Sequence, residues 1–318
     1  MPRLTVLARL LVLALLATVA ACSTTNAPPN APTAPTTAVS TSLPAHKIIV
    51  AATTTQVTAL AQVVGGDKID LTGILKANVD PHEYEPTPQD VRTLANAQLI
   101  VINGVGLENW LDKVISNSGS QAPIVDTSKG VIIHKGDPEE PAGDPHIWFA
   151  VPNDIVMLDN IRDGLIRVDP ANADTYQANA AAYTQKLNDL DQYIQQQIAS
   201  IPPANRKFVT NHDAFGYYTD RYGLTFVGSI IPSMDTNYEP SAQDLARLVE
   251  AIKAQGVKAI FTESSINPRL AQQIGQEAGV KVVNGALYGD TLGPAGSNAY
   301  TLDGMLRYDT DLIVTNLK

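Results

Sequence analysis

Three histidines and one aspartate stand out because each lies in a short polar or Gly/Pro-marked segment directly after an apolar run. These residues are His82, His146, His212 and Asp290. In open α/β proteins, residues that serve a site tend to occupy such segments at the ends of strands. Imidazole nitrogens and a carboxylate are common ligands of divalent metals, and three nitrogens with one carboxylate can fill a four-coordinate shell. If the four side chains converge, we expect them to hold one divalent cation.

The other polar and aromatic candidates are interpreted as structural. A lone histidine is more often a hydrogen-bonded structural residue than a ligand, and His46 and His134 are assigned to that role. Glu239 and Glu263 are candidates for orienting the imidazoles from outside the shell, as ligating histidines usually require. They are equally interpretable as helix-terminal or surface carboxylates, so both are left out of the predicted site. Four aromatic residues are assigned to packing: Trp110, Trp148, Tyr217 and Tyr218.

Residues 1–21 are predicted to be a secretory signal peptide. Arg3 and Arg9 precede or enter a short apolar stretch that is followed by small residues. This stretch is well below the roughly 20 residues that a membrane-spanning helix needs. It ends in Val19-Ala20-Ala21-Cys22, which resembles the lipobox of bacterial lipoproteins, where cleavage precedes the cysteine and the cysteine is lipidated. The alternative is an ordinary signal peptide with an incidental cysteine. Since Cys22 is the only cysteine, an internal disulfide is excluded.

Residues 22–45 are predicted to be a lipidated cysteine followed by a disordered tether. The segment consists almost entirely of Ser, Thr, Ala, Pro and Asn and carries no charge. It cannot bury enough apolar surface to fold, and its prolines keep part of it extended. Placed after a lipid-anchored Cys22, it would hold a folded domain away from a membrane. The globular part therefore begins near His46.

The charge of the chain bears on its partners. The formal net charge is −10. Removal of the signal peptide would take away two arginines and no acidic residue, so the mature chain would be more negative still. An acidic body argues against nucleic acid as a partner and mildly favours cations.

A seven-residue segment occurs twice, as Tyr84-Glu85-Pro86-Thr87-Pro88-Gln89-Asp90 and as Tyr238-Glu239-Pro240-Ser241-Ala242-Gln243-Asp244. In both copies a Thr or Ser is followed three residues later by Asp, and apolar residues follow at helical spacing. This pattern predicts a helix N-cap with a carboxylate in the first turn. Apolar runs follow each helix at 99–102 and 259–261, and they predict buried strands of parallel sheets. The two halves of the chain are therefore expected to share a plan.

The remaining apolar runs fit the same repeated layout. Further strands are predicted at 48–50, 69–71, 124–125, 208–210, 226–227 and 280–283. Helical patterns lie between most of them, which favours parallel sheets with helices on their faces. About 270 residues are more than one compact core usually organises, so two lobes or one large α/β domain are the options.

The strongest helical pattern lies between the two halves. Asp169 is a good N-cap with Pro170 after it, and apolar residues then recur at steps of three or four to about Ser200, before Pro202. Such a helix would be roughly 45 Å long at 1.5 Å per residue. We therefore predict an α/β fold of two lobes, each with a parallel sheet flanked by helices, joined by one long rigid helix. The expected boundaries are 46–168 for the N-terminal lobe, 169–201 for the linking helix and 202–318 for the C-terminal lobe.

In its motifs and its order of elements, the chain resembles the cluster A-I substrate-binding lipoproteins of bacterial ABC transporters for zinc and manganese. The resemblance covers nearly the whole chain after the tether and rests on five segments. They are Asp80-Pro81-His82-Glu83-Tyr84-Glu85-Pro86, Asp144-Pro145-His146-Ile147-Trp148, the segment 210–218, Glu263-Ser264-Ser265-Ile266-Asn267-Pro268 and the segment 287–293. The resemblance implies two α/β lobes joined by one long helix with the metal at their interface. It also implies that His82 and His146 are ligands from the first lobe, and that His212 and Asp290 are ligands from the second.

The identity of the metal follows less firmly from the resemblance. Members that look dedicated to manganese have a Glu where this chain has His212, so the histidine favours zinc as cargo. Many zinc members carry a His-rich loop before the second ligand, whereas here His134 is the only histidine of that loop. The loop is acidic instead, through Asp137, Glu139, Glu140 and Asp144. Manganese, or both ions, therefore stays open as an alternative.

The leading hypothesis is a binding protein without catalysis. The resemblance implies an extracytoplasmic protein, anchored to the bacterial cell membrane by lipid at Cys22, that hands a divalent cation to an ABC permease and its ATPase. A shuttle of this kind is most simply a monomer.

Two other classes of protein fit the sequence less well. A secreted zinc hydrolase usually keeps one metal position for water with a general base nearby, and the chain has no His-Glu-x-x-His motif. A relative that binds an organic ligand, such as a siderophore or corrinoid, would have no use for the four metal positions. Adhesion is sometimes attributed to such lipoproteins, but no feature of this sequence bears on it.

Overall fold

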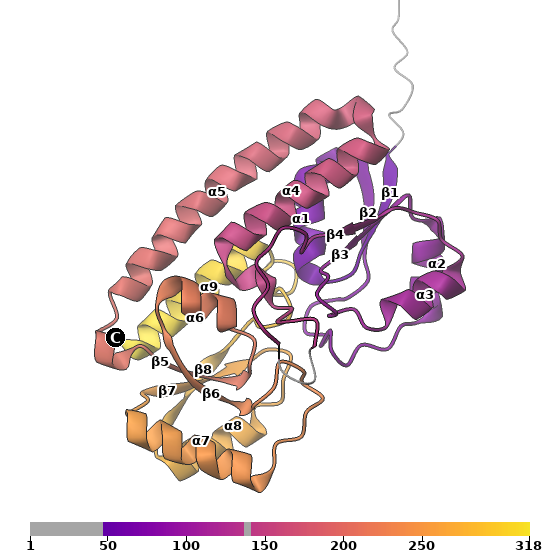
Figure 1. Ribbon diagram of the computed structural model, residues 1–318. Coiled ribbons are helices and arrows are strands. Elements are labelled where there is room, and N and C mark those ends of the chain that lie inside the picture. The colour runs from indigo at the N-terminus through magenta and orange to yellow at the C-terminus, as the bar shows by residue number, and fades with distance from the viewer. Residues whose placement is uncertain (1–46, 137–140) are drawn as a thin grey trace, which may run out of the picture. The chain divides into compact units, whose positions relative to one another are not determined.

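The computed structural model describes residues 47–136 and 141–318. The first lobe is built on a four-stranded parallel sheet (Figure 1). Its strands are β1 Ile48–Ala52, β2 Ile69–Gly73, β3 Leu99–Ile102 and β4 Ile124–Asp126. They lie in the order β2-β1-β3-β4, with every neighbouring pair parallel. Its helices are α1 Thr55–Gly65, α2 Pro88–Asn96 and α3 Leu111–Ser118. The parallel sheet predicted for this half is confirmed.

The second lobe repeats the alternation of strands and helices. Its strands are β5 Lys207–His212, β6 Thr225–Ile231, β7 Ala259–Glu263 and β8 Lys281–Leu287. Its helices are α6 Gly216–Tyr222, α7 Ala242–Gln255, α8 Arg269–Ala278 and α9 Leu302–Leu317. The predicted parallel pairing is confirmed, but it is divided into two hydrogen-bonded pairs, β5-β6 and β7-β8, with β5 beside β7. Each pair contains a register shift, at Phe208/Val209 and between Ile260 and Thr262.

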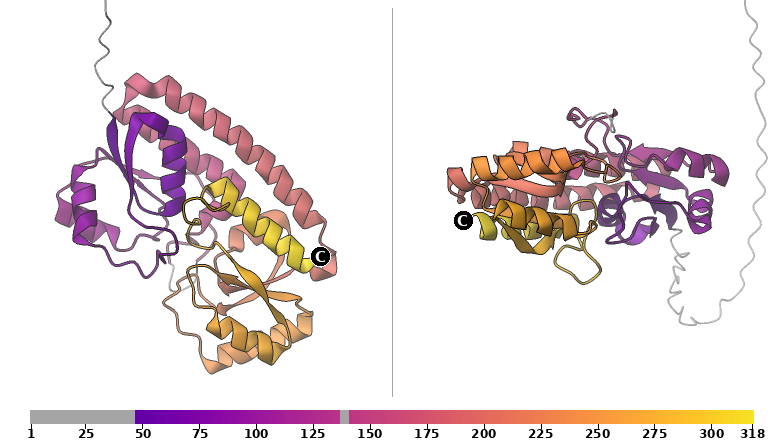
Figure 2. Two further views of the ribbon diagram at one scale, coloured as in Figure 1. Left: turned by 180° about the vertical axis from the view of Figure 1, so that it is seen from behind. Right: turned by 90° about the horizontal axis from the view of Figure 1, so that it is seen from below.

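Two long helices, α4 Val151–Val168 and α5 Ala173–Ala199, join the lobes and pack against each other. The long linking helix is confirmed, and its start differs slightly from the prediction. Asp169 caps a 3-10 turn at Pro170–Asn172, where it accepts hydrogen bonds from Asn172 and Tyr176, and α5 proper begins after that turn. Figure 2 shows α9 running beside α5 on the same side of the molecule.

One continuous hydrophobic core extends through both lobes. It includes the inner faces of the sheets together with α1, α4, α5 and α9. The alternation of a strand is clear in β1, where Val50 and Ala52 face this core and Ala51 faces a smaller outer cluster under α2 and α3. A second outer cluster lies under α7 and α8. Because the inner core is shared, a large hinge opening of the lobes would expose it, which favours small relative shifts.

The repeated sequence segment performs the same task in both lobes. At the start of α2 the Asp90 carboxylate accepts from the backbone N–H and hydroxyl of Thr87. At the start of α7 the Asp244 carboxylate accepts from the same two groups of Ser241. The predicted helix caps are therefore confirmed, and each capped helix precedes a buried strand, β3 or β7.

Several sequence predictions lie outside the described residues. They concern the signal peptide at 1–21, Cys22, the tether up to residue 45, His46, and Asp137, Glu139 and Glu140 of the acidic loop. Among the helices of the described segments, none has both the length and the apolar character needed to cross a membrane.

Candidate metal centre

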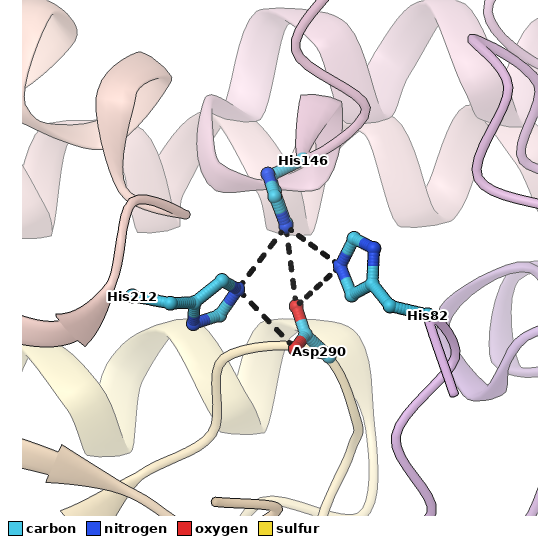
Figure 3. A group of neighbouring side chains, drawn as sticks. All are labelled: His82, His146, His212 and Asp290. Carbon is cyan, nitrogen blue, oxygen red and sulfur yellow. Dashed lines mark hydrogen bonds and ion pairs between the residues drawn. The ribbon is translucent and has the colours of Figure 1, made fainter. Parts of the chain in front are cut away.

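The four predicted ligands converge between the lobes, and together they are called the His/Asp cluster (Figure 3). His82 lies in the loop between β2 and α2, and His146 lies just before a 3-10 turn that leads into α4. His212 is the last residue of β5, and Asp290 follows β8. All four side chains are buried, although His82 retains 7% exposure. Each lobe thus supplies two members.

The distances within the His/Asp cluster suit a small metal ion. The Nε2 atom of His146 lies 3.3 Å from that of His82 and 3.4 Å from that of His212. The Asp290 oxygens complete the group, with Oδ1 3.3 Å from His146 Nε2 and Oδ2 3.4 Å from His212 Nε2. Ligands placed tetrahedrally about zinc at about 2.0 Å are separated by about 3.3 Å. His82 Nε2 and Asp290 Oδ1 are further apart, at 4.0 Å.

The two first-lobe histidines of the cluster lie in turns of the same kind. In each Asp-Pro-His segment the aspartate side chain accepts a hydrogen bond from the backbone N–H of the histidine two residues later. The N···O distance is 2.9 Å both for Asp80 with His82 and for Asp144 with His146. This Asx-type turn is a local property of the sequence. It therefore constrains the backbone of each histidine from within its own segment.

Two buried carboxylates orient the imidazoles. Asp144 Oδ1 lies 2.7 Å from Nδ1 of His146. Glu263 Oε1 on β7 lies 3.0 Å from Nδ1 of His212 and 3.1 Å from its backbone nitrogen. Because Nδ1 is engaged in both rings, Nε2 is left to bind a metal. Sequence reasoning left Glu263 out of the site and did not consider Asp144 for this role, whereas Glu239 is exposed.

The electrostatics of the His/Asp cluster favour positive charge. Burial opposes protonation of His146, but Asp144 and Asp290 outweigh it and raise its pKa to about 9. Burial likewise opposes protonation of His212, yet Asp290 and Glu263 raise the pKa of that imidazole well above its usual value. Burial would raise the pKa of Asp290, but the histidines around it hold that pKa well below the usual range. A dication that displaces the protons would meet the same demand for positive charge.

The other sequence candidates lie outside the His/Asp cluster. The ring of His134 stacks on Tyr217 at a centroid distance of 3.9 Å, and its Nε2 is 3.9 Å from Asp220. The Tyr217 hydroxyl donates to the backbone oxygen of Asp144, so Tyr217 supports the turn before His146 in addition to packing. Trp110 packs against Tyr84.

A fold of two α/β lobes braced by long helices, with a buried His/Asp cluster between them, defines a class of two-lobed metal-binding proteins. The chain belongs to the family described as zinc-uptake complex component A, periplasmic, whose model matches residues 50–316. The predicted family of metal ABC transporter substrate-binding proteins is thereby confirmed.

The relatives carry both metals in their names. The manganese-binding lipoprotein MntA of Halalkalibacterium halodurans is 33% identical over 255 residues, which are 80% of this chain and 83% of that protein. MntA of Bacillus subtilis is 31% identical over 279 residues, which are 86% of this chain and 90% of that protein. Among solved structures, the periplasmic zinc-binding protein TroA from Treponema pallidum matches with a TM-score of 0.80 and 30% identity. The match covers 86% of this chain and 99% of that one.

Proposed function

We propose that this protein captures one divalent metal ion in the His/Asp cluster outside the cytoplasmic membrane and delivers it to an ABC permease driven by an ATPase. The observation that carries the proposal is the convergence of three Nε2 atoms and one carboxylate within 4.8 Å of one another in a buried site. All four donors come from the protein, which suits binding better than catalysis.

The remaining features complete the proposed transport role. Cys22 is the proposed lipid anchor and 22–45 the tether. The transport domain comprises lobes at 46–168 and 202–318 with the linker 169–201, and it acts as a monomer. Nucleic acid is not a partner of this acidic chain.

Zinc is the favoured cargo. Three imidazoles and one carboxylate form a donor set that suits zinc, and four of the five closest donor separations, 3.3 to 3.4 Å, are those of a tetrahedral zinc shell. Manganese is the second candidate, because both Asp290 oxygens face the cluster and would allow a fifth donor. The names of the MntA relatives favour it as well.

Release of the ion follows from the division of ligands between the lobes. Two ligands come from each lobe, so a small relative shift separates the two pairs without unfolding either one. Docking on the permease would impose that shift. The continuous core, which resists a wide opening, supports release by a small displacement.

The test is a competition between the two ions. The purified protein is stripped with a chelator and titrated with zinc and manganese, and bound metal is measured by elemental analysis. We expect one equivalent of zinc that excess manganese does not displace. Reversible exchange of both ions at comparable concentrations would instead support a manganese or dual-metal carrier, and the absence of stoichiometric metal would overturn the proposal.

The ligand assignment has its own matched pair of variants. His212→Ala removes one of four donors and leaves Glu263 without its imidazole partner, so metal affinity should fall at least a hundredfold, about 2.7 kcal/mol. His134→Ala, which removes a histidine stacked on Tyr217 away from the cluster, should leave affinity unchanged. Equal affinity in both variants would refute the assignment.

A further inference from the structure

A buried hydrogen bond crosses between the lobes directly beside the His/Asp cluster. The indole N–H of Trp148 donates to the backbone oxygen of Gly289 at 3.1 Å. Trp148 is fully buried, and its ring meets the imidazole of His146 edge-on, at a centroid distance of 5.4 Å. Gly289 immediately precedes Asp290. One side chain of the first lobe therefore touches a first-lobe ligand and also holds the backbone that carries a second-lobe ligand.

Gly289 is also related to the site by the space where a side chain would lie. A Cβ atom at this position would lie 1.9 Å from Glu263 Oε2. Glu263 is the carboxylate that orients His212, so the space left by the glycine is occupied by a group on which that ligand depends. A glycine is thus required at position 289 because the Glu263 carboxylate lies so close to its backbone. It is not required by an unusual backbone angle.

We propose that Trp148 and Gly289 are positioning residues that couple the ligand pairs of the two lobes and set how long the metal is retained. The inference rests on the proposed function and adds the device that holds the site closed. Through Gly289, three ligands are placed relative to one another: Asp290 along the chain, His212 by way of Glu263, and His146 by way of Trp148. A shift of the lobes that releases the metal must break the Trp148–Gly289 bond. This bond therefore opposes dissociation more than it affects capture.

The first test is Trp148→Phe, which keeps an aromatic ring and removes the donor. Loss of a buried hydrogen bond that leaves its acceptor unpaired should raise the zinc dissociation rate about tenfold. The rate is measured by stopped flow with an excess of chelator as a trap, and the association rate should change much less. The matched control is Trp110→Phe, since the indole nitrogen of Trp110 is buried without a hydrogen-bond partner in the described part of the chain. Dissociation from Trp148→Phe at the wild-type rate would overturn the proposal.

The second test isolates Gly289 and stays informative if Trp148→Phe does not fold. Gly289→Ala should displace Glu263 and weaken zinc binding about tenfold or more, because residues that orient metal-ligating histidines typically matter by that amount. In a Glu263→Ala background the added methyl group has room, so Gly289→Ala should then cost little further affinity. Equal losses of affinity in both backgrounds would show that Gly289 does not act through Glu263 and would refute that part of the proposal.

Failure of the proposed function and failure of the coupling role would give different results. If the wild-type protein binds no stoichiometric metal, the proposed function is wrong. If it binds one metal and both tests give wild-type kinetics and affinity, the proposed function stands and the coupling role of Trp148 and Gly289 is wrong.

Discussion

The two lobes contribute equally to the His/Asp cluster, but they hold their histidines by different means. In the first lobe the carboxylate on His146 comes from Asp144, two residues earlier in the same turn. In the second lobe the carboxylate on His212 comes from Glu263, 51 residues later on another strand. Those strands, β5 and β7, belong to separate hydrogen-bonded pairs. The first-lobe imidazole is therefore oriented locally, whereas the orientation of the second-lobe imidazole depends on how two strand pairs pack.

This difference shows which half of the site is sensitive to the rest of the molecule. A distortion of the first lobe would carry His146 and Asp144 along together, since they share one turn. A sliding of β5 past β7 would separate His212 from Glu263 and leave a buried carboxylate unpaired, which is costly. Small changes in the second lobe should therefore alter metal binding more than equal changes in the first.

The largest effect is expected from pH. In the metal-free protein the pKa of His146 is raised to about 9 from 6.5. A proton bound more tightly in the folded state stabilises it, by up to about 3 kcal/mol below pH 6.5, and this contribution is lost as the pH rises through 9. Bound metal replaces the proton, so metal affinity should rise over the same range. The difference in melting temperature between metal-bound and metal-free protein should therefore widen between pH 6.5 and 9, as measured by calorimetry.

The same titration separates the lobes. Asp144→Asn removes one of the charges that raise the pKa of His146, so the metal-free protein should lose less stability between pH 6.5 and 9 than the wild type. Glu263→Gln acts on His212 and should leave the His146 titration, followed by NMR, in place. If Asp144→Asn and the wild type gave the same pH dependence, the local account of the first-lobe ligand would be wrong.

Removal of the two orienting carboxylates should disturb regions of different extent. Asp144→Ala and Glu263→Ala should each weaken metal binding ten- to a hundredfold, about 1.4 to 2.7 kcal/mol, measured by calorimetric titration. Hydrogen exchange should distinguish them. Faster exchange in Asp144→Ala should be confined to the turn around His146, whereas in Glu263→Ala it should extend along β5 and β7. The same spread of exchange in both variants would remove the proposed distinction between local and tertiary orientation.

The elements of the fold were predictable wherever one face of an element is uniformly apolar. The run 99–102 is β3 as predicted, and the residues at helical spacing in α5 are buried. Helix α4 was not predicted as an individual element, because its buried face includes Asp154 and Gly164, which interrupt the apolar stripe. The division of the second-lobe strands into two pairs, each with a register shift, leaves no mark on the hydrophobic pattern.

The candidate site was predictable to the extent that its signals are local. Each Asp-Pro-His turn spans three residues, so one short segment contains the proposed ligand and, for His146, its orienting carboxylate. The contact of Glu263 with His212 spans 51 residues, and that of Trp148 with Gly289 spans 141. Contacts at such separations depend on tertiary packing. For this reason the sequence predicts only a packing role for Trp148 and does not place Glu263 in the site.

The smallest expected effect concerns the repeated helix caps, which test whether the lobes are equivalent away from the metal. Thr87→Ala and Ser241→Ala should each cost about 1 kcal/mol of stability, because the cap and its carboxylate lose their mutual hydrogen bonds. Gln243→Ala, an exposed change in the same turn as Ser241, should cost much less. The shift of the urea midpoint of the metal-free protein measures all three. Similar shifts for the two caps would confine the asymmetry between lobes to the ligands, whereas a much larger shift for one cap would show that the lobes differ in stability as a whole.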